Sequence, residues 1–81
     1  MSRKINALQR ITTVLENKLP VKEVKTTLVN NVYQLEITSN NGKTIKHFIS
    51  KYDIDYLYTD TEVYYYTRVV VTTVSKLLEN A

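Results

Sequence analysis

Cysteine is absent from this sequence of 81 residues, and glycine, proline and histidine each occur only once. Disulfide bonds are therefore excluded, and a single histidine, His47, without any thiolate cannot assemble a zinc site. The lone Gly42 excludes the glycine-rich loops that hold phosphate groups. We accordingly expect neither a cofactor nor a bound metal. A chain of this length has room for one domain, residues 1–81, with a small core and a modest stability.

Long apolar runs are also missing. No stretch approaches the ~20 apolar residues of a membrane-spanning helix, and the N-terminal segment carries a charge every few residues instead of the apolar core of a signal sequence. We predict an intracellular, cytoplasmic protein with no membrane contact. Residues with AT-rich codons, such as lysine, asparagine, isoleucine and tyrosine, are common, which favours a virus or other mobile element as the source and a host cell as the setting.

Residues Ser2 to Leu19 have the pattern of an amphipathic helix. Ser2 is a suitable N-cap, and Pro20 disfavours helical backbone at Leu19, so the helix should end there. Between these limits, apolar side chains recur at three- and four-residue spacing and define one buried stripe, made of Ile5, Leu8, Ile11, Val14, Leu15 and Leu19.

From Val21 the pattern changes to the two-residue period of β-strands. A two-residue turn at Asn30 and Asn31, which tolerate positive φ, joins two antiparallel strands. The resulting register gives one apolar face and one polar face with complementary charges. The apolar face pairs Leu28 with Tyr33, Thr26 with Leu35 and Val24 with Ile37, and the polar face pairs Lys25 with Glu36 and Thr27 with Gln34. Burial and charge thus predict the same register.

A second turn follows at residues 39–43. A three-residue loop with Gly42 in the left-handed conformation pairs Ile45 with Ile37 and Lys46 with Glu36. A two-residue loop at Asn41 and Gly42 would reverse the faces of the third strand. We prefer the first register because it buries two isoleucines and pairs a charge. It directs His47 and Ile49 to the apolar face and Phe48 to the opposite one.

The segment from Ser50 to Asp60, SKYDIDYLYTD, permits two interpretations. Its partial alternation fits a short fourth strand at residues 52–58, and Asp53 fits the start of a helical turn. Neither pattern dominates. The acidic residues Asp53, Asp55, Asp60 and Glu62 lack the spacing of a calcium loop, so we interpret them as solvated.

The run TEVYYYTRVVVTTV, Thr61 to Val74, decides the architecture. Valine, threonine and tyrosine favour a strand, but apolar residues recur at helical spacing. The expected buried stripe contains Val63, Tyr66, Val70, Val74 and Leu77, flanked by Thr67, Thr73 and Leu78. Thr59 and Glu62 form a capping box directly before it. A strand that is apolar on both faces must be buried on both faces of a sheet, and a chain this short cannot cover both. We therefore predict a helix and an α+β fold, α-β-β-β-α, with two helices on one face of a three-stranded antiparallel sheet.

This choice of helix leaves aromatic side chains on its solvent face. Counting about 100° per residue places Tyr64, Tyr65, Arg68 and Thr72, with Ser75, away from the buried stripe. Tyr64 and Arg68 can form a cation–π pair. In one interpretation the preceding connector covers these rings as part of a secondary core. In the other they form a protein interface, either of a homodimer or with an unidentified partner protein.

No group of residues has the pattern of a catalytic centre, so we do not expect an enzyme. Nucleic-acid binding is the alternative function, with Arg3, Lys4, Arg10 and Lys18 contacting phosphates and Tyr52 stacking on bases. The element order is that of double-stranded-RNA-binding domains, but their lysine cluster at the start of the last helix is replaced by Asp60 and Glu62. That family is therefore not assigned.

Overall fold

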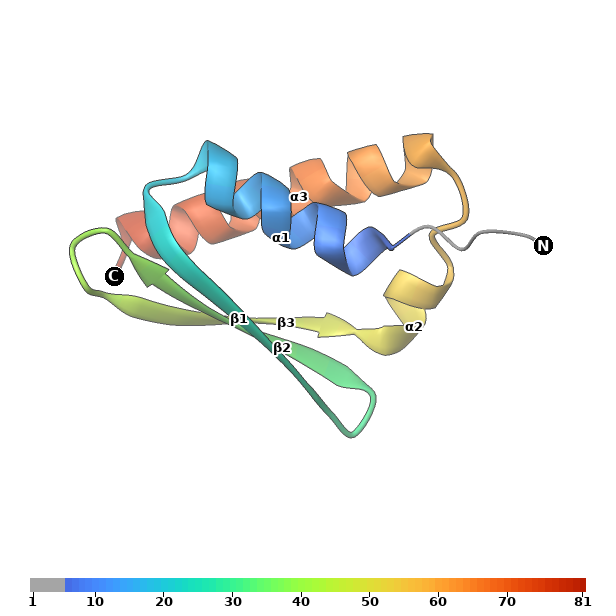
Figure 1. Ribbon diagram of the computed structural model, residues 1–81, viewed down its shortest axis with the longest axis horizontal. Coiled ribbons are helices and arrows are strands. Elements are labelled where there is room, and N and C mark those ends of the chain that lie inside the picture. The colour runs from blue at the N-terminus through green and yellow to red at the C-terminus, as the bar shows by residue number, and fades with distance from the viewer. Residues whose placement is uncertain (1–5) are drawn as a thin grey trace.

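The computed structural model describes residues 6–81 and has two layers, a three-stranded sheet and a pair of long helices on one of its faces (Figure 1). The predicted α+β order is confirmed, with one additional short helix before the last one. The elements are α1 (Ala7–Lys18), β1 (Val21–Val29), β2 (Val32–Ser39), β3 (Thr44–Ser50), α2 (Lys51–Asp55) and α3 (Asp60–Glu79).

Helix α1 begins later than expected. Its N-cap is Asn6, whose side chain accepts a hydrogen bond from the backbone N–H of Gln9 at 3.1 Å. Ser2, the predicted cap, lies outside the described residues. The helix ends where Pro20 predicts, with Leu19 in extended conformation.

The antiparallel sheet has the order β1-β2-β3, and both predicted registers are confirmed. Asn30 and Asn31 have φ values of 49° and 64°, the left-handed conformation that a two-residue hairpin turn requires. Gly42 has a φ of 90°, and its amide donates to the carbonyl of Ser39 at 3.0 Å, as expected for the longer second turn. Local turn chemistry thus fixed which face of each strand is apolar.

The tip of the hairpin formed by β1 and β2 points away from the layer of the two long helices (Figure 1). Leu28, close to its tip, lies on the face predicted to be apolar and pairs with Tyr33, but it is 49% exposed. Residues nearer the helices on the same face, such as Leu35 and Ile37, are fully buried. The apolar face is therefore covered only where α1 and α3 reach it.

Residues 52–58 do not form a fourth strand. Ser50 caps a helical turn, and its hydroxyl accepts a hydrogen bond from the amide of Tyr52 at 3.2 Å. The helical alternative was therefore the correct one, although its cap is Ser50 and not Asp53. Asp53 instead provides the acidic residue of the first turn.

Helix α3 is confirmed, but its buried stripe is displaced from the predicted one. Thr67 is buried, whereas Thr73 is exposed, Leu77 is 38% exposed and Tyr66 is only half-buried. The residues of α3 that face the sheet and α1 are Val63, Thr67, Val70 and Val74. The core that these elements enclose consists of Ile11, Leu15, Val21, Leu35, Ile37, Ile49, Val70 and Val74.

Candidate protein-interaction surface

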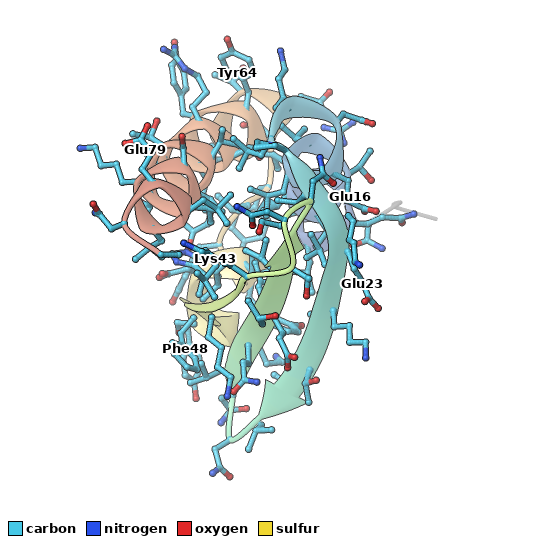
Figure 2. The ribbon with its side chains drawn as sticks, turned by 90° about the vertical axis from the view of Figure 1, so that its left-hand side faces the viewer. Glu16, Glu23, Lys43, Phe48, Tyr64 and Glu79 are labelled. Carbon is cyan, nitrogen blue, oxygen red and sulfur yellow. The ribbon has the colours of Figure 1, made fainter. Side chains whose placement is uncertain are left out.

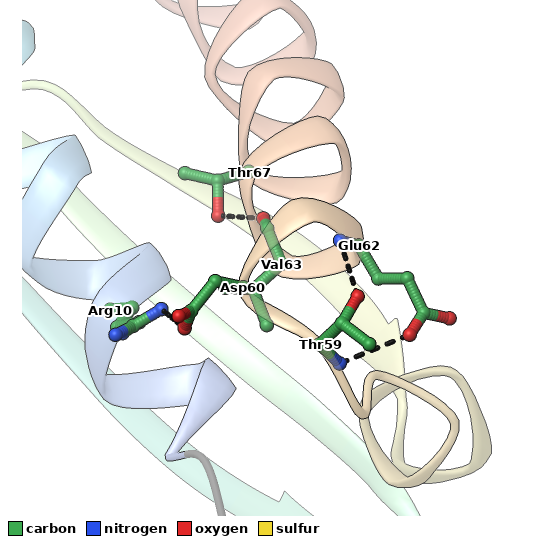
Figure 3. A network of polar contacts seen from close by, with 6 residues as sticks. All are labelled: Arg10, Thr59, Asp60, Glu62, Val63 and Thr67. Atoms are coloured by element: carbon green, nitrogen blue, oxygen red, sulfur yellow. Dashed lines mark hydrogen bonds and ion pairs between the residues drawn. The ribbon is translucent and has the colours of Figure 1, made fainter.

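Side-chain hydrogen bonds fix the start of α3. The amide of Glu62 donates to the hydroxyl of Thr59 at 3.1 Å, and the amide of Thr59 donates to the carboxylate of Glu62 at 3.0 Å (Figure 3). This is the predicted capping box. Asp60, in the first turn, also forms an ion pair with Arg10 of α1 at 2.6 Å. These contacts set both the start of α3 and its position beside α1.

The four residues predicted as an interface all lie on the exposed side of α3. Tyr64 and Tyr65 are each 59% exposed, and Arg68 and Thr72 are exposed as well. Figure 2 shows Tyr64 projecting from the helix layer away from the sheet. The interpretation in which the connector covers these rings is therefore wrong. Ser75, expected on the same side, is half-buried.

The exposed aromatic rings are ordered by contacts with one another. Tyr64 and Tyr65 meet edge to face, with ring centroids 5.5 Å apart and an interplanar angle of 73°. The guanidinium carbon of Arg68 lies 5.8 Å from the centroid of the Tyr64 ring, which is the predicted cation–π pair. Binding to a partner would cost these tyrosine side chains less conformational entropy, because the rings are already held in place.

Two further residues of this surface were missed by the sequence reasoning. Val69 is 65% exposed, and Thr73, expected beside the buried stripe, is exposed. The hydroxyl of Thr73 donates to the carbonyl of Val69 at 3.0 Å, so its polar group is satisfied within the helix and its methyl group is left for contact. The 100° count could have found Val69, because it places Val69 well away from the stripe formed by Val63, Thr67, Val70 and Val74.

These side chains surround a shallow hollow on the outer face of α3. It has a volume of about 380 Å³ and is lined by Tyr65, Arg68, Val69, Thr72 and Thr73. We call this set, together with Tyr64, the outer face of α3. It combines two tyrosines, a valine and one arginine, a composition typical of a protein-binding surface.

A second depression, of about 800 Å³, lies between α1 and α3. Val14, Val63 and Val71 contribute apolar lining, and the charged residues that line it are Arg10, Lys18, Asp60 and Arg68. The structure thus brings together Arg10 and Lys18, two residues of the predicted nucleic-acid set, with Tyr64 and Arg68 of the outer face. Tyr52 lies in α2 and does not line this groove. Arg3 and Lys4 lie outside the described residues.

Tyr66 lies on the opposite flank of α3 from this groove. Its hydroxyl donates to the carboxylate of Asp53 at 3.4 Å and so connects α3 with α2. Burial, together with the negative charge and hydrogen bond of Asp53, raises the pKa of Tyr66 to about 12. The aromatic residue that the connector does contact is therefore Tyr66, and this contact is structural.

The remaining ionisable groups are dispersed. Within residues 6–81 no three His, Cys, Asp or Glu side chains come together as metal ligands. Asp55 pairs with Lys51 at 2.8 Å, while Asp53 and Asp60 make the separate contacts described above. Burial lowers the pKa of His47 on the inner face of β3. In the described part of the chain, no helix is both long enough and apolar enough to traverse a bilayer.

Comparison with known proteins provides no relative from which a function can be transferred. No family model, no curated protein and no solved structure matches this chain. The function must therefore be inferred from the fold and from the surfaces that it exposes.

Proposed function

We propose that this protein is a non-enzymatic interaction protein that self-associates through the outer face of α3. The observation that carries this proposal is the exposure of Tyr64, Tyr65 and Val69, each 59% or more, side by side on one ordered helix. Tyrosine and arginine are enriched among the residues that dominate binding energy, and the cation–π and edge-to-face contacts preorganise them. Within residues 6–81, no core contact accounts for these exposed side chains.

The size of the domain supports association with a second copy. A chain of 81 residues has a small core, and it has no cysteine with which to form disulfide bonds. Burying Tyr65 and Val69 against another copy removes apolar area from water at about 25 cal/mol per Å². Dimerisation therefore adds stability where the monomer has little. The reducing cytoplasm, including that of a host cell, fits a chain without disulfides, and the AT-rich composition favours a virus or mobile element as its source.

Sedimentation velocity over a range of micromolar concentrations tests this proposal. We expect a concentration-dependent dimer, and we expect Tyr65→Ala to weaken its association about tenfold, which corresponds to ~1.4 kcal/mol. Tyr58→Ala is the matched control, because Tyr58 is 68% exposed but lies in the connector between α2 and α3. A chain that remains monomeric at every concentration, with or without Tyr65, would overturn the proposal.

Nucleic-acid binding is the second candidate, and the groove between α1 and α3 is the observation in its favour. The groove gathers Arg10, Lys18 and Arg68 around the ring of Tyr64, so cations for phosphates and an aromatic surface for a base occur together. The ion pair of Arg10 with Asp60 weakens this candidate, because it already neutralises one of the three cations.

A gel-shift assay with mixed single- and double-stranded DNA and RNA at low salt tests this candidate. The double variant Arg10→Ala with Lys18→Ala is expected to bind nucleic acid more weakly, and the binding that remains should depend less on salt. Lys25→Ala with Lys46→Ala removes the same charge from the opposite face of the sheet and is the matched control. Equal losses from both double variants would indicate non-specific attraction, and no retention at low salt would eliminate the candidate.

A further inference from the structure

Along the exposed side of α3, an acidic, an aliphatic and a basic residue follow one another at equal intervals in the sequence. Glu62, Val69 and Lys76 are seven residues apart and all exposed. Seven residues make nearly two helical turns, so the three side chains share one face, with a drift of only about 20° between successive ones. Val69 therefore lies midway between a negative charge near the start of the helix and a positive charge near its end.

This order of charges is complementary to itself under a two-fold rotation. If an axis crosses α3 at Val69, two copies of the helix pack antiparallel, and residues equally far from Val69 in sequence oppose each other. Glu62 of each copy then faces Lys76 of the other, and the pair occurs twice. In the same arrangement Tyr65 of each copy faces Thr73 of the other.

We infer that the second copy proposed above docks antiparallel along α3, with the two-fold axis at Val69 and two Glu62–Lys76 pairs between the copies. This inference rests on the proposed self-association and specifies its geometry. Val69, Tyr65 and Thr73 form the apolar centre of the contact, and the two ion pairs stand at its ends, an apolar centre with a polar rim.

The charges disfavour two alternative arrangements. An axis at Arg68 would place two guanidinium groups against each other, and a parallel arrangement would place Glu62 on Glu62 and Lys76 on Lys76. Among residues 6–81, the ion pairs of the monomer involve Arg10, Lys25 and Lys51, and Lys76 takes part in none of them. The positive end of the face is therefore unpaired in a single copy.

The local shape agrees with this arrangement. The shallow hollow of about 380 Å³ has Tyr65, Val69 and Thr73 among its lining residues, so an apolar side chain of the second copy has a place to enter. Thr73 directs its hydroxyl to the carbonyl of Val69, which leaves a methyl group to face the opposing Tyr65 ring. Glu62 uses one carboxylate oxygen for the capping box, and its second oxygen remains to accept from Lys76.

Charge reversal tests the arrangement. Lys76→Glu makes both ends of the face acidic, and Glu62→Lys makes both ends basic, so each variant alone should dimerise about tenfold more weakly, an effect reduced by salt. Mixing the two variants restores both pairs, and a heterodimer of near wild-type affinity is expected in sedimentation experiments. Because the mixture contains the same altered helices, recovery cannot arise from repaired folding of either chain.

Cysteine cross-linking gives an independent reading in a chain that has no native cysteine. V69C, at the axis, should form a disulfide-linked dimer under mild oxidation, since two copies of an axial residue lie close together. K76C is the control, because its two copies would be about 20 Å apart along the helices, far beyond the reach of a disulfide.

The outcomes separate this inference from the function on which it rests. A wild-type chain that is monomeric at every concentration overturns the proposed self-association. A wild-type dimer that is indifferent to both charge reversals, or that cross-links through K76C and not through V69C, overturns only the antiparallel arrangement. Weakened single variants, a restored mixture and a V69C cross-link support it.

Discussion

The two sides of α3 both carry valine and threonine, but only the exposed side also carries tyrosine and arginine, and their environments are opposite. The inner side consists of Val63, Thr67, Val70 and Val74, all buried against the sheet and α1, while the outer side presents Tyr64, Tyr65 and Val69 to solvent. Burial on the inner side is explained by the core. The outer side has no corresponding contact within residues 6–81, and this difference is the basis of the proposed contact with a second copy.

Threonine shows how alike the two sides are in local chemistry. Buried Thr67 donates its hydroxyl to the carbonyl of Val63 at 2.6 Å, and exposed Thr73 donates to the carbonyl of Val69 at 3.0 Å. Both hydroxyl groups are therefore satisfied within the helix, and each threonine directs its methyl group away from the helix axis, Thr67 towards the core and Thr73 towards solvent. For valine and threonine, which occur on both sides, burial is therefore decided by position relative to the sheet and α1 and not by residue type.

The largest expected effect comes from placing an aspartate on each side in turn. Val70 is 3% exposed and Val69 is 65% exposed. Val70→Asp buries a carboxylate at a cost of several kcal/mol, comparable with a total stability of about 4–12 kcal/mol for a chain of this length, so we expect an unfolded chain. Val69→Asp should retain the fold within about 0.5 kcal/mol but abolish dimerisation.

Circular dichroism during urea unfolding, at a concentration low enough to keep the chain monomeric, measures the first effect, and sedimentation measures the second. The same substitution at adjacent positions controls for helix propensity. Equal loss of structure in both variants would show that the outer side belongs to the core and would remove the contrast between the two sides.

A smaller effect on the free energy of unfolding is expected from the capping box at the start of α3. Thr59→Ala removes one half of the capping box and should lower the free energy of unfolding by about 1 kcal/mol. Thr61→Ala, two residues later, removes an exposed threonine within the first turn and should change stability by less than about 0.5 kcal/mol. Chemical denaturation of both variants checks this, and a cap that contributes no more than Thr61 would contradict the prediction.

The contact between Tyr66 and α2 predicts a dependence on alkaline pH. The folded-state pKa of Tyr66, about 12, lies above the ordinary value of 10. The folded state therefore retains the proton more tightly, and its stabilising contribution, complete below pH 10, is lost as the pH rises towards 12. Tyr66→Phe should lose less stability than the wild type over this interval, and Asp53→Asn should fall between them. Urea unfolding at pH 9 and pH 11 measures the difference; identical losses in all three would contradict it.

The smallest effect is expected from the ion pair between the two long helices. Arg10 and Asp60 are both largely exposed, so solvent screens their attraction even at 2.6 Å. Arg10→Ala should lower the free energy of unfolding by no more than about 1 kcal/mol. Thermal unfolding at low and high salt measures it, and a larger loss would contradict the prediction that solvent screens this pair.

Much of the fold could be predicted because it depends on neighbours in sequence. The Asn30–Asn31 turn and Gly42 fixed the registers of both hairpins, and the capping box fixed the start of α3. Residues 52–58 could not be assigned from the sequence. A five-residue helix is little more than one turn long, and over so few residues helical spacing cannot be distinguished from the alternation of a strand. The proximity of Arg10 to Asp60, 50 residues away, has no local sequence signature.

The candidate surface was predicted in part. The spacing of Tyr64, Tyr65, Arg68 and Thr72 placed them on the exposed side, where they lie. Val69 was overlooked, and Thr73 and Leu77 were expected near the core. The reason is that apolar residues occur on more than one side of α3 in almost every turn. A pattern of this kind does not specify a single stripe.

The sequence by itself determined the three strands, their turns and pairing, and the two long helices, because φ preferences, capping and alternation act within a few residues. Only the tertiary structure decided which apolar residues of α3 are used inside. The sheet and α1 accept a stripe of limited width, so Val63, Val70 and Val74 fill it and Val69 is left at the surface. That division depends on the shape of the space between the layers, which no local pattern encodes.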